Sequence, residues 1–162
     1  MKPAQPREFP WSWERTPGWR GQFDRARRWR QRLLASAGKA DADFTFDAAL
    51  AFFINCYHVR DWLERSGEIG KSALDQLFTD SFALRVCADL ANIAKHYDLT
   101  NTPRMTRQLS VACEYADPGF GWLGDQARLT ILSDGQQLDV LELTATCEAD
   151  WLSFLRQQSL VQ

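Results

Sequence analysis

The stretch FDAALAFFINCYHVRDWLERS (46–66) decides the fold, because its apolar residues recur at helical spacing along its whole length. Thr45 precedes it as a candidate N-cap, and glycines at 67 and 70 follow it. We therefore expect a helix over 46–66 with one buried face. The residues of that apolar stripe are Phe46, Ala49, Leu50, Phe53, Cys56, Tyr57 and Leu63.

Two further helices are expected around this one. Ser72 is a candidate N-cap for a helix over 73–97, and the short connection GEIGK (67–71) predicts an antiparallel hairpin of 46–66 with 73–97. A helix over 20–37 precedes this hairpin and ends at Gly38.

The second half of the chain changes character. RQLSVACEYA (107–116) alternates like a strand, and ARLTILS-DG-QQLDVLELTA (127–145) has the pattern of a β-hairpin around a type I′ turn at Asp134-Gly135. A last helix is expected from Thr146. The predicted fold is α+β: a helical bundle with a long antiparallel helix hairpin, a small three-stranded antiparallel sheet and a C-terminal helix. Within the hairpin, one face is expected to carry Leu129, Ile131, Leu138 and Val140.

Length and composition indicate one soluble domain over 1–162, with a Trp/Pro-rich N-terminal arm at 1–19 that could contact a partner protein. The net charge of −2 gives no general attraction to nucleic acid or to membranes, so RNA binding would need a local patch. The chain shows no signal-peptide pattern and no apolar run long enough to cross a bilayer, which favours a cytoplasmic protein without membrane partners.

The four cysteines, at 56, 87, 113 and 147, are widely spaced, and no two form a C-x-x-C pair. All four lie in apolar segments. This indicates buried free thiols in a reducing compartment, and a secreted protein with two disulfides is the alternative. We expect no cofactor.

A polar side of the helix predicted at 73–97 is the main candidate site. Arg85, Asp89, Asn92 and His96 follow one another at steps of four, three and four, so they share one side of a helix. His58 and Asp61 lie one turn apart on the neighbouring helix and are supporting candidates. The chain has only these two histidines.

Three interpretations of these residues stay open. In the first, they form a structural polar network between helices of a non-enzymatic interaction module. In the second, they form a metal-independent ribonuclease site. There, His96 transfers a proton, Arg85 holds the phosphate and Asn92 orients either group, while four basic side chains bind the RNA. Those four are Arg25, Arg28, Arg32 and Lys95.

The third interpretation is a metal site made of His58, Asp61, Asp89 and His96, although we favour a site without metal. H-x-x-D on a helix is a usable pair of ligands, but the E-x-x-H pattern of di-metal bundles is missing from the chain.

A helical hairpin that ends in NIAKH (92–96) resembles the HEPN superfamily over residues 46–99. Many of these helical domains are RNA-cleaving toxins or defence effectors, and they form composite sites across a homodimer. Their motif is an arginine, usually followed by a polar residue, with a histidine four to six positions on. This chain matches at Asn92 and His96, whereas Arg85 lies eleven residues before His96 and departs from the motif. YHVRDWL (57–63) and ADLANIAKH (88–96) also resemble segments of small bacterial and phage-associated proteins.

Overall fold

The computed structural model describes residues 18–37, 41–96, 109–115, 127–133 and 135–162, with 95–96, 109–115 and 127–128 described by their backbone alone. The elements in chain order are α1 (Gly18–Ser36), α2 (Ala42–Ser66), α3 (Lys71–Asp80), α4 (Phe82–His96), β1 (Leu109–Tyr115), β2 (Ala127–Ser133), β3 (Gln136–Asp139) and α5 (Val140–Gln157). The predicted combination of a helical body, a small antiparallel sheet and a C-terminal helix is confirmed.

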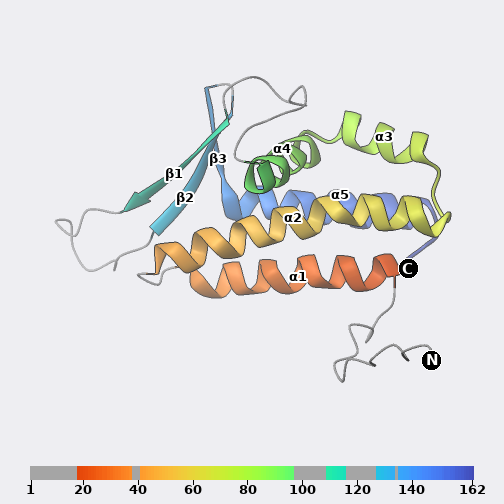
Figure 1. Cartoon of the computed structure of the whole chain (residues 1–162), viewed down its shortest axis with the longest axis horizontal. Coiled ribbons are helices and arrows are strands. Elements are labelled where there is room, and N and C mark those ends of the chain that lie inside the picture. Colours follow the sequence, from red (N-terminus) through yellow and green to blue (C-terminus); the bar gives the residue numbers. More distant parts are fainter. Residues whose placement is uncertain (1–17, 38–40, 97–108, 116–126, 134) are drawn as a thin grey trace, which may run out of the picture.

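The long antiparallel pair is α1 with α2, which lie side by side in Figure 1. The predicted hairpin of 46–66 with 73–97 is wrong on this point. Trp19, Phe23, Ala26 and Leu33 are all buried and extend along α1, so α1 can cover α2 over most of its length. The short α3 follows α2, α4 crosses above α2, and α5 lies behind it (Figure 1).

The helix predicted over 73–97 is broken at Ser81, whose backbone is extended (φ −91°, ψ 112°). The Ser81 hydroxyl accepts a hydrogen bond from the Leu84 backbone N–H at 3.0 Å, as an N-cap does. It also donates to Asp150 of α5 at 2.6 Å. The break comes before Arg85, so the polar residues from 85 to 96 still belong to one uninterrupted helix, α4.

The beginning of α2 also differs from the prediction. Asp41 is the N-cap and accepts from the Phe44 N–H at 2.9 Å, so the helix begins at Ala42 and not after Thr45. Phe46, predicted in the buried stripe, is 37% exposed. The buried face is shifted accordingly, to Thr45, Ala48, Ala49, Phe52, Phe53, Cys56, Val59 and Leu63.

The sheet has the order β1-β2-β3 and is antiparallel, with Ile131 opposite Val111 on one side and Leu138 on the other. Asp134 of the predicted turn lies outside the described residues. Val140, predicted as a strand residue, is the first residue of α5.

The α5 helix begins earlier than the predicted Thr146, because Asp139 caps its N-terminus. The Asp139 carboxylate accepts from the N–H groups of Leu141 (2.8 Å) and Glu142 (3.1 Å). The segment 140–145 is apolar enough for a strand, but the buried residues Leu143, Cys147 and Trp151 follow one another at steps of four. That spacing places them on one face of a helix.

One core joins α1, α2, α4 and α5, and the largest of its fully buried side chains is Trp151. Trp151 contacts Phe78 and Phe154 edge to face, with ring centroids 5.8 and 6.1 Å apart. Of the predicted arm at 1–19, Gly18 and Trp19 belong to α1, and the rest lies outside the described residues. No helix in the described part of the chain combines the length and the apolar character that crossing a membrane requires.

Candidate functional site

Arg85 lies at the edge of an open pocket of about 490 Å³, which Asp75, Phe78 and Thr79 of α3 also line. Its guanidinium donates a hydrogen bond to the Thr79 backbone carbonyl and lies 6.0 Å from the centre of the Phe82 ring. The break at Ser81 places α3 and the first turn of α4 around this pocket. A guanidinium at the wall of an open pocket is suited to binding an anion.

The other predicted residues of α4 differ in exposure. Asp89 is buried at 2% exposed and Asn92 is half-buried. His96 is the last residue of α4, and its side chain, like that of Lys95, lies outside the described part. The helix therefore keeps the predicted order of Arg85, Asn92 and His96 along one side, and it takes the Asp89 carboxylate out of solvent.

His58 and Asp61 form the predicted pair on α2. The His58 Nδ1 and Asp61 Oδ2 atoms are 2.8 Å apart, and the two side chains are 38% and 37% exposed. The neighbouring Arg60 contacts Asp75 of α3 and lies 3.9 Å from Glu64. This surface joins α2 to α3 through ion pairs that water can reach.

The predicted RNA-binding arginines lie on α1, which is on the other side of α2 from α4 (Figure 1). Arg28 and Arg32 are exposed, and the Arg32 guanidinium stacks 4.4 Å from the centre of the Trp29 ring. Arg25 is half-buried and donates to the Gln22 side chain at 2.9 Å. The structure thus places these arginines apart from Arg85, on a helix that lies across α2 from α4 (Figure 1).

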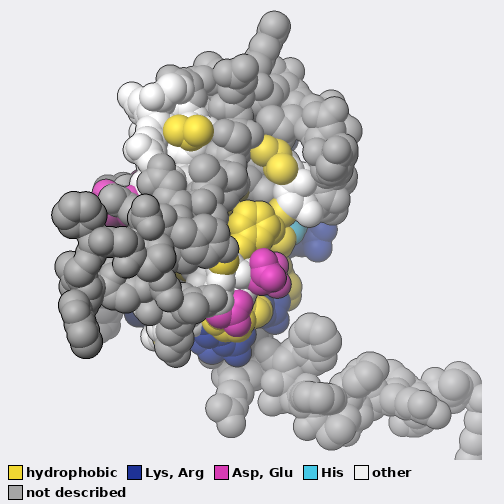
Figure 2. Space-filling view, turned by 90° about the vertical axis from the view of Figure 1, so that its left-hand side faces the viewer, with side chains coloured by type: hydrophobic (Ala, Val, Ile, Leu, Met, Phe, Trp, Pro, Cys, Tyr) yellow, Lys and Arg dark blue, Asp and Glu magenta, His cyan; other side chains and the backbone are white. Residues whose placement is uncertain are grey.

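Acidic side chains offset part of the basic surface of α1. Glu148 of α5 accepts from Arg27 at 2.8 Å and from Arg30 at 3.1 Å. Figure 2 shows one end of the molecule, where basic side chains gather at the lower edge and acidic ones lie directly above them. The described residues of this end therefore present mixed charge.

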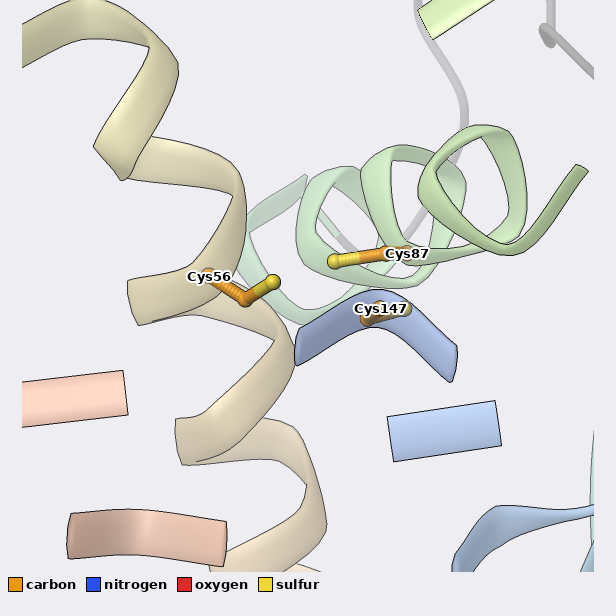
Figure 3. Close-up of side chains that lie close together, drawn as sticks. All are labelled: Cys56, Cys87 and Cys147. Carbon is orange, nitrogen blue, oxygen red and sulfur yellow. The ribbon is translucent and has the colours of Figure 1, made fainter. Parts of the chain in front are cut away.

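A site that the sequence did not indicate lies in the core. Cys56 of α2, Cys87 of α4 and Cys147 of α5 point toward one another (Figure 3), and their three sulfur atoms all lie within 4.8 Å of each other. Within the described residues, this is the only group of three or more His, Cys, Asp or Glu side chains close enough to share a metal ion. The alternative metal site is therefore not assembled from His58, Asp61 and Asp89.

The three cysteines are free and buried, as predicted, at 0–1% exposed. Two of them contact backbone carbonyls: the Cys87 thiol donates to Phe53 O and the Cys147 thiol to Ala83 O, each at 3.4 Å. Each cysteine lies on the buried face of its own helix. The helical spacing predicted this for Cys56 and Cys87, and the apolar surroundings indicated burial for Cys147, whereas the meeting of the three depends on how the helices pack.

The ionisation of the cluster is shared among its members. Burial opposes the ionisation of Cys56, but the neighbouring Cys147 and Cys87 thiols and the Trp151 indole outweigh it and lower the pKa of Cys56 to about 5. Burial, together with the interactions with Cys56, raises the pKa of Cys87 and of Cys147 well above the value of an ordinary thiol. The three pKa values therefore belong to one interacting group of thiols, in which Cys56 ionises first.

The sequence matches no protein-family model, and comparisons with curated proteins and with solved structures found no match. The resemblance to HEPN domains accordingly stays a prediction, and the geometry of the chain itself carries the functional argument.

Proposed function

We propose that the protein binds and cleaves RNA in the manner of HEPN domains, as a toxin or defence component, with its site on the polar side of α4. The observation that carries this proposal is the position of Arg85. Its guanidinium is half-exposed at a pocket of about 490 Å³, on the same helix as Asn92 and His96.

Metal-independent cleavage of RNA requires three chemical groups. A guanidinium holds the phosphate and its developing negative charge, an imidazole transfers the proton, and an amide orients one of the two. Arg85, Asn92 and His96 supply these groups without a metal. The distance from Arg85 to His96 along one straight helix is about 16 Å, because each residue adds about 1.5 Å. A second copy of the chain would bring the two ends together, so the active species is a homodimer with composite sites.

RNA degradation by the wild type and by His96→Ala, with and without a chelator, tests this function. We expect the wild type to cleave RNA equally with and without chelator and His96→Ala to lose about a hundredfold or more. Arg156→Ala is the matched control, since it removes an exposed arginine in the last turn of α5 that belongs to no predicted site. Equal cleavage by wild type and His96→Ala would overturn the proposal, and loss on chelation would favour metal chemistry.

The alternative is a non-enzymatic interaction module whose polar groups hold the helices together. The buried carboxylate of Asp89 and the engagement of Arg85 with Thr79 support it. If purified wild type neither binds nor cleaves RNA while Arg85→Ala lowers stability by about 1 kcal/mol or more, the module is the function.

A further inference from the structure

The three buried cysteines form a pocket for one ion. Three sulfur atoms bound at about 2.3 Å to a central atom lie about 4 Å apart when the centre is planar, and about 3.4 Å apart when it is pyramidal with angles near about 95°. The sulfurs of Cys56, Cys87 and Cys147 are already within 4.8 Å of one another. A contraction of at most about 1.5 Å would therefore complete the site, without unfolding any of the three helices.

Trp151 is a second, independent indication that the cysteine cluster accommodates an electron-rich group. Its indole is 0% exposed, and its Nε1–H has no acceptor with hydrogen-bond geometry among the described residues. The same indole lies beside Cys56, one of the three cysteines. A buried donor without an acceptor costs free energy, which a bound thiolate complex beside it would offset.

We propose that Cys56, Cys87 and Cys147 bind a trivalent thiophilic ion of the arsenite type through three sulfur atoms. Charge decides the class of ion. Three thiolates and a trivalent centre give a neutral complex, which a dry core accepts, whereas a divalent or monovalent ion would leave a net negative charge there.

Coordination number supports the same choice. Among the described residues no fourth His, Cys, Asp or Glu side chain joins the cluster, and zinc sites are almost always four-coordinate. Trivalent arsenic is satisfied by three sulfurs and a lone pair.

The binding step balances without an oxidant. Arsenious acid, As(OH)₃, reacts with three thiols: three As–O bonds break, three As–S bonds form, and each thiol proton leaves with a hydroxide as water. Arsenic stays trivalent throughout.

A surface pocket beside α4 lies close to the cysteine cluster. Ala83 and Leu143 line an open pocket of about 330 Å³ between α4 and α5. The Ala83 carbonyl oxygen is 3.4 Å from the Cys147 sulfur, so the cluster lies one residue layer below the floor of this pocket. A small neutral molecule such as As(OH)₃ needs only a local opening there.

Arsenite titration of the full chain in a phosphine reductant, read by native mass spectrometry and ultraviolet absorption of the As–S bonds, tests the proposal. We expect one arsenic per chain with loss of three protons. Cys56→Ser, Cys87→Ser and Cys147→Ser should each weaken binding by about tenfold or more. Cys113→Ser, on β1, is the matched control and should bind like the wild type.

Alkylation of the wild type keeps the test independent of how well the variants fold. Bound arsenite should protect residues 56, 87 and 147 and leave the alkylation of Cys113 unchanged. Full binding in any of the three variants, loss of binding in Cys113→Ser, or binding of zinc or copper(I) without arsenite would overturn the assignment. RNA cleavage is measured separately, so failure here leaves the proposed function standing.

Discussion

The two sides of α4 differ in almost every physical property. Cys87 faces the core at 0% exposed, whereas Arg85, two residues earlier, is half-exposed at an open pocket. The first side packs against α2 and α5, whereas on the second side Arg85 donates a hydrogen bond to the Thr79 carbonyl of α3. One helix therefore carries a buried thiol site on one side and a solvent-accessible polar site on the other. Substitutions in the two sites should differ in their effect on stability.

The largest expected effect comes from the core next to the thiols. Trp151→Ala should lower the free energy of unfolding by about 3–5 kcal/mol, because it removes a fully buried indole and two edge-to-face ring contacts. Urea denaturation followed by circular dichroism measures it. Trp62→Ala, at a 43% exposed position of α2, is the control and should change stability by less than about 0.5 kcal/mol. Equal losses in both variants would contradict the burial on which the comparison depends.

The sequence predicted most of the helical content, because apolar spacing of three and four residues marks a buried face directly. The segments expected at 20–37 and 46–66 correspond to α1 and α2. It did not predict the break at Ser81, which lacks glycine or proline and depends on the contact with Asp150. The start of α5 was missed because the apolar residues after Asp139 also suit a strand.

The second prediction concerns the pH dependence of stability, to which the thiols of the core should contribute. In the folded protein the pKa of Cys56 is about 5, below the 9.0 of an ordinary thiol, so between these values the unfolded chain binds a proton that the folded chain does not. The free energy of unfolding should therefore rise with pH from about 5 to 9, with a slope on the order of 1 kcal/mol per pH unit.

Above pH 9 the sign reverses. Cys87 and Cys147 keep their protons in the folded state while the unfolded chain loses them, so stability falls. Urea denaturation of wild type and Cys56→Ser across this range measures both limbs, and Cys113→Ser controls for loss of a thiol elsewhere. A wild-type profile that Cys56→Ser reproduces over pH 5–9 would show that the cluster holds no thiolate.

The two candidate sites differ in how much of each could be predicted from the sequence. Arg85, Asp89, Asn92 and His96 share a helix, so their common side follows from spacing alone. The three cysteines come from three helices, and their meeting depends on the rotation of each helix about its axis. Spacing within a helix carries no information on that rotation relative to a neighbour. The buried character of each cysteine was the only available signal.

The third prediction concerns the junction where α4 begins. Ser81→Ala should lower the free energy of unfolding by about 1–2 kcal/mol, since it removes the bond from the Leu84 N–H and the bond to the Asp150 carboxylate. Thermal unfolding measures it. Ser72→Ala is the matched control, because Ser72 was the predicted cap but lies exposed inside the first turn of α3. A larger loss of stability for Ser72→Ala than for Ser81→Ala would indicate that the helix runs unbroken through residue 81, as the spacing predicted.

The smallest effect on stability is expected at the solvent-exposed surface of α2. Asp61→Asn should change the free energy of unfolding by less than about 0.5 kcal/mol, although the carboxylate is 2.8 Å from the His58 ring, because both side chains are more than one-third exposed. Urea denaturation at low and high salt measures it, with Asp43→Asn in the exposed first turn of α2 as the control. If Asp61→Asn costs 2 kcal/mol or more, roughly the value of a buried charged bond, the polar surface is structural like the core. If it costs little and still slows RNA cleavage, the pair serves the function proposed for α4.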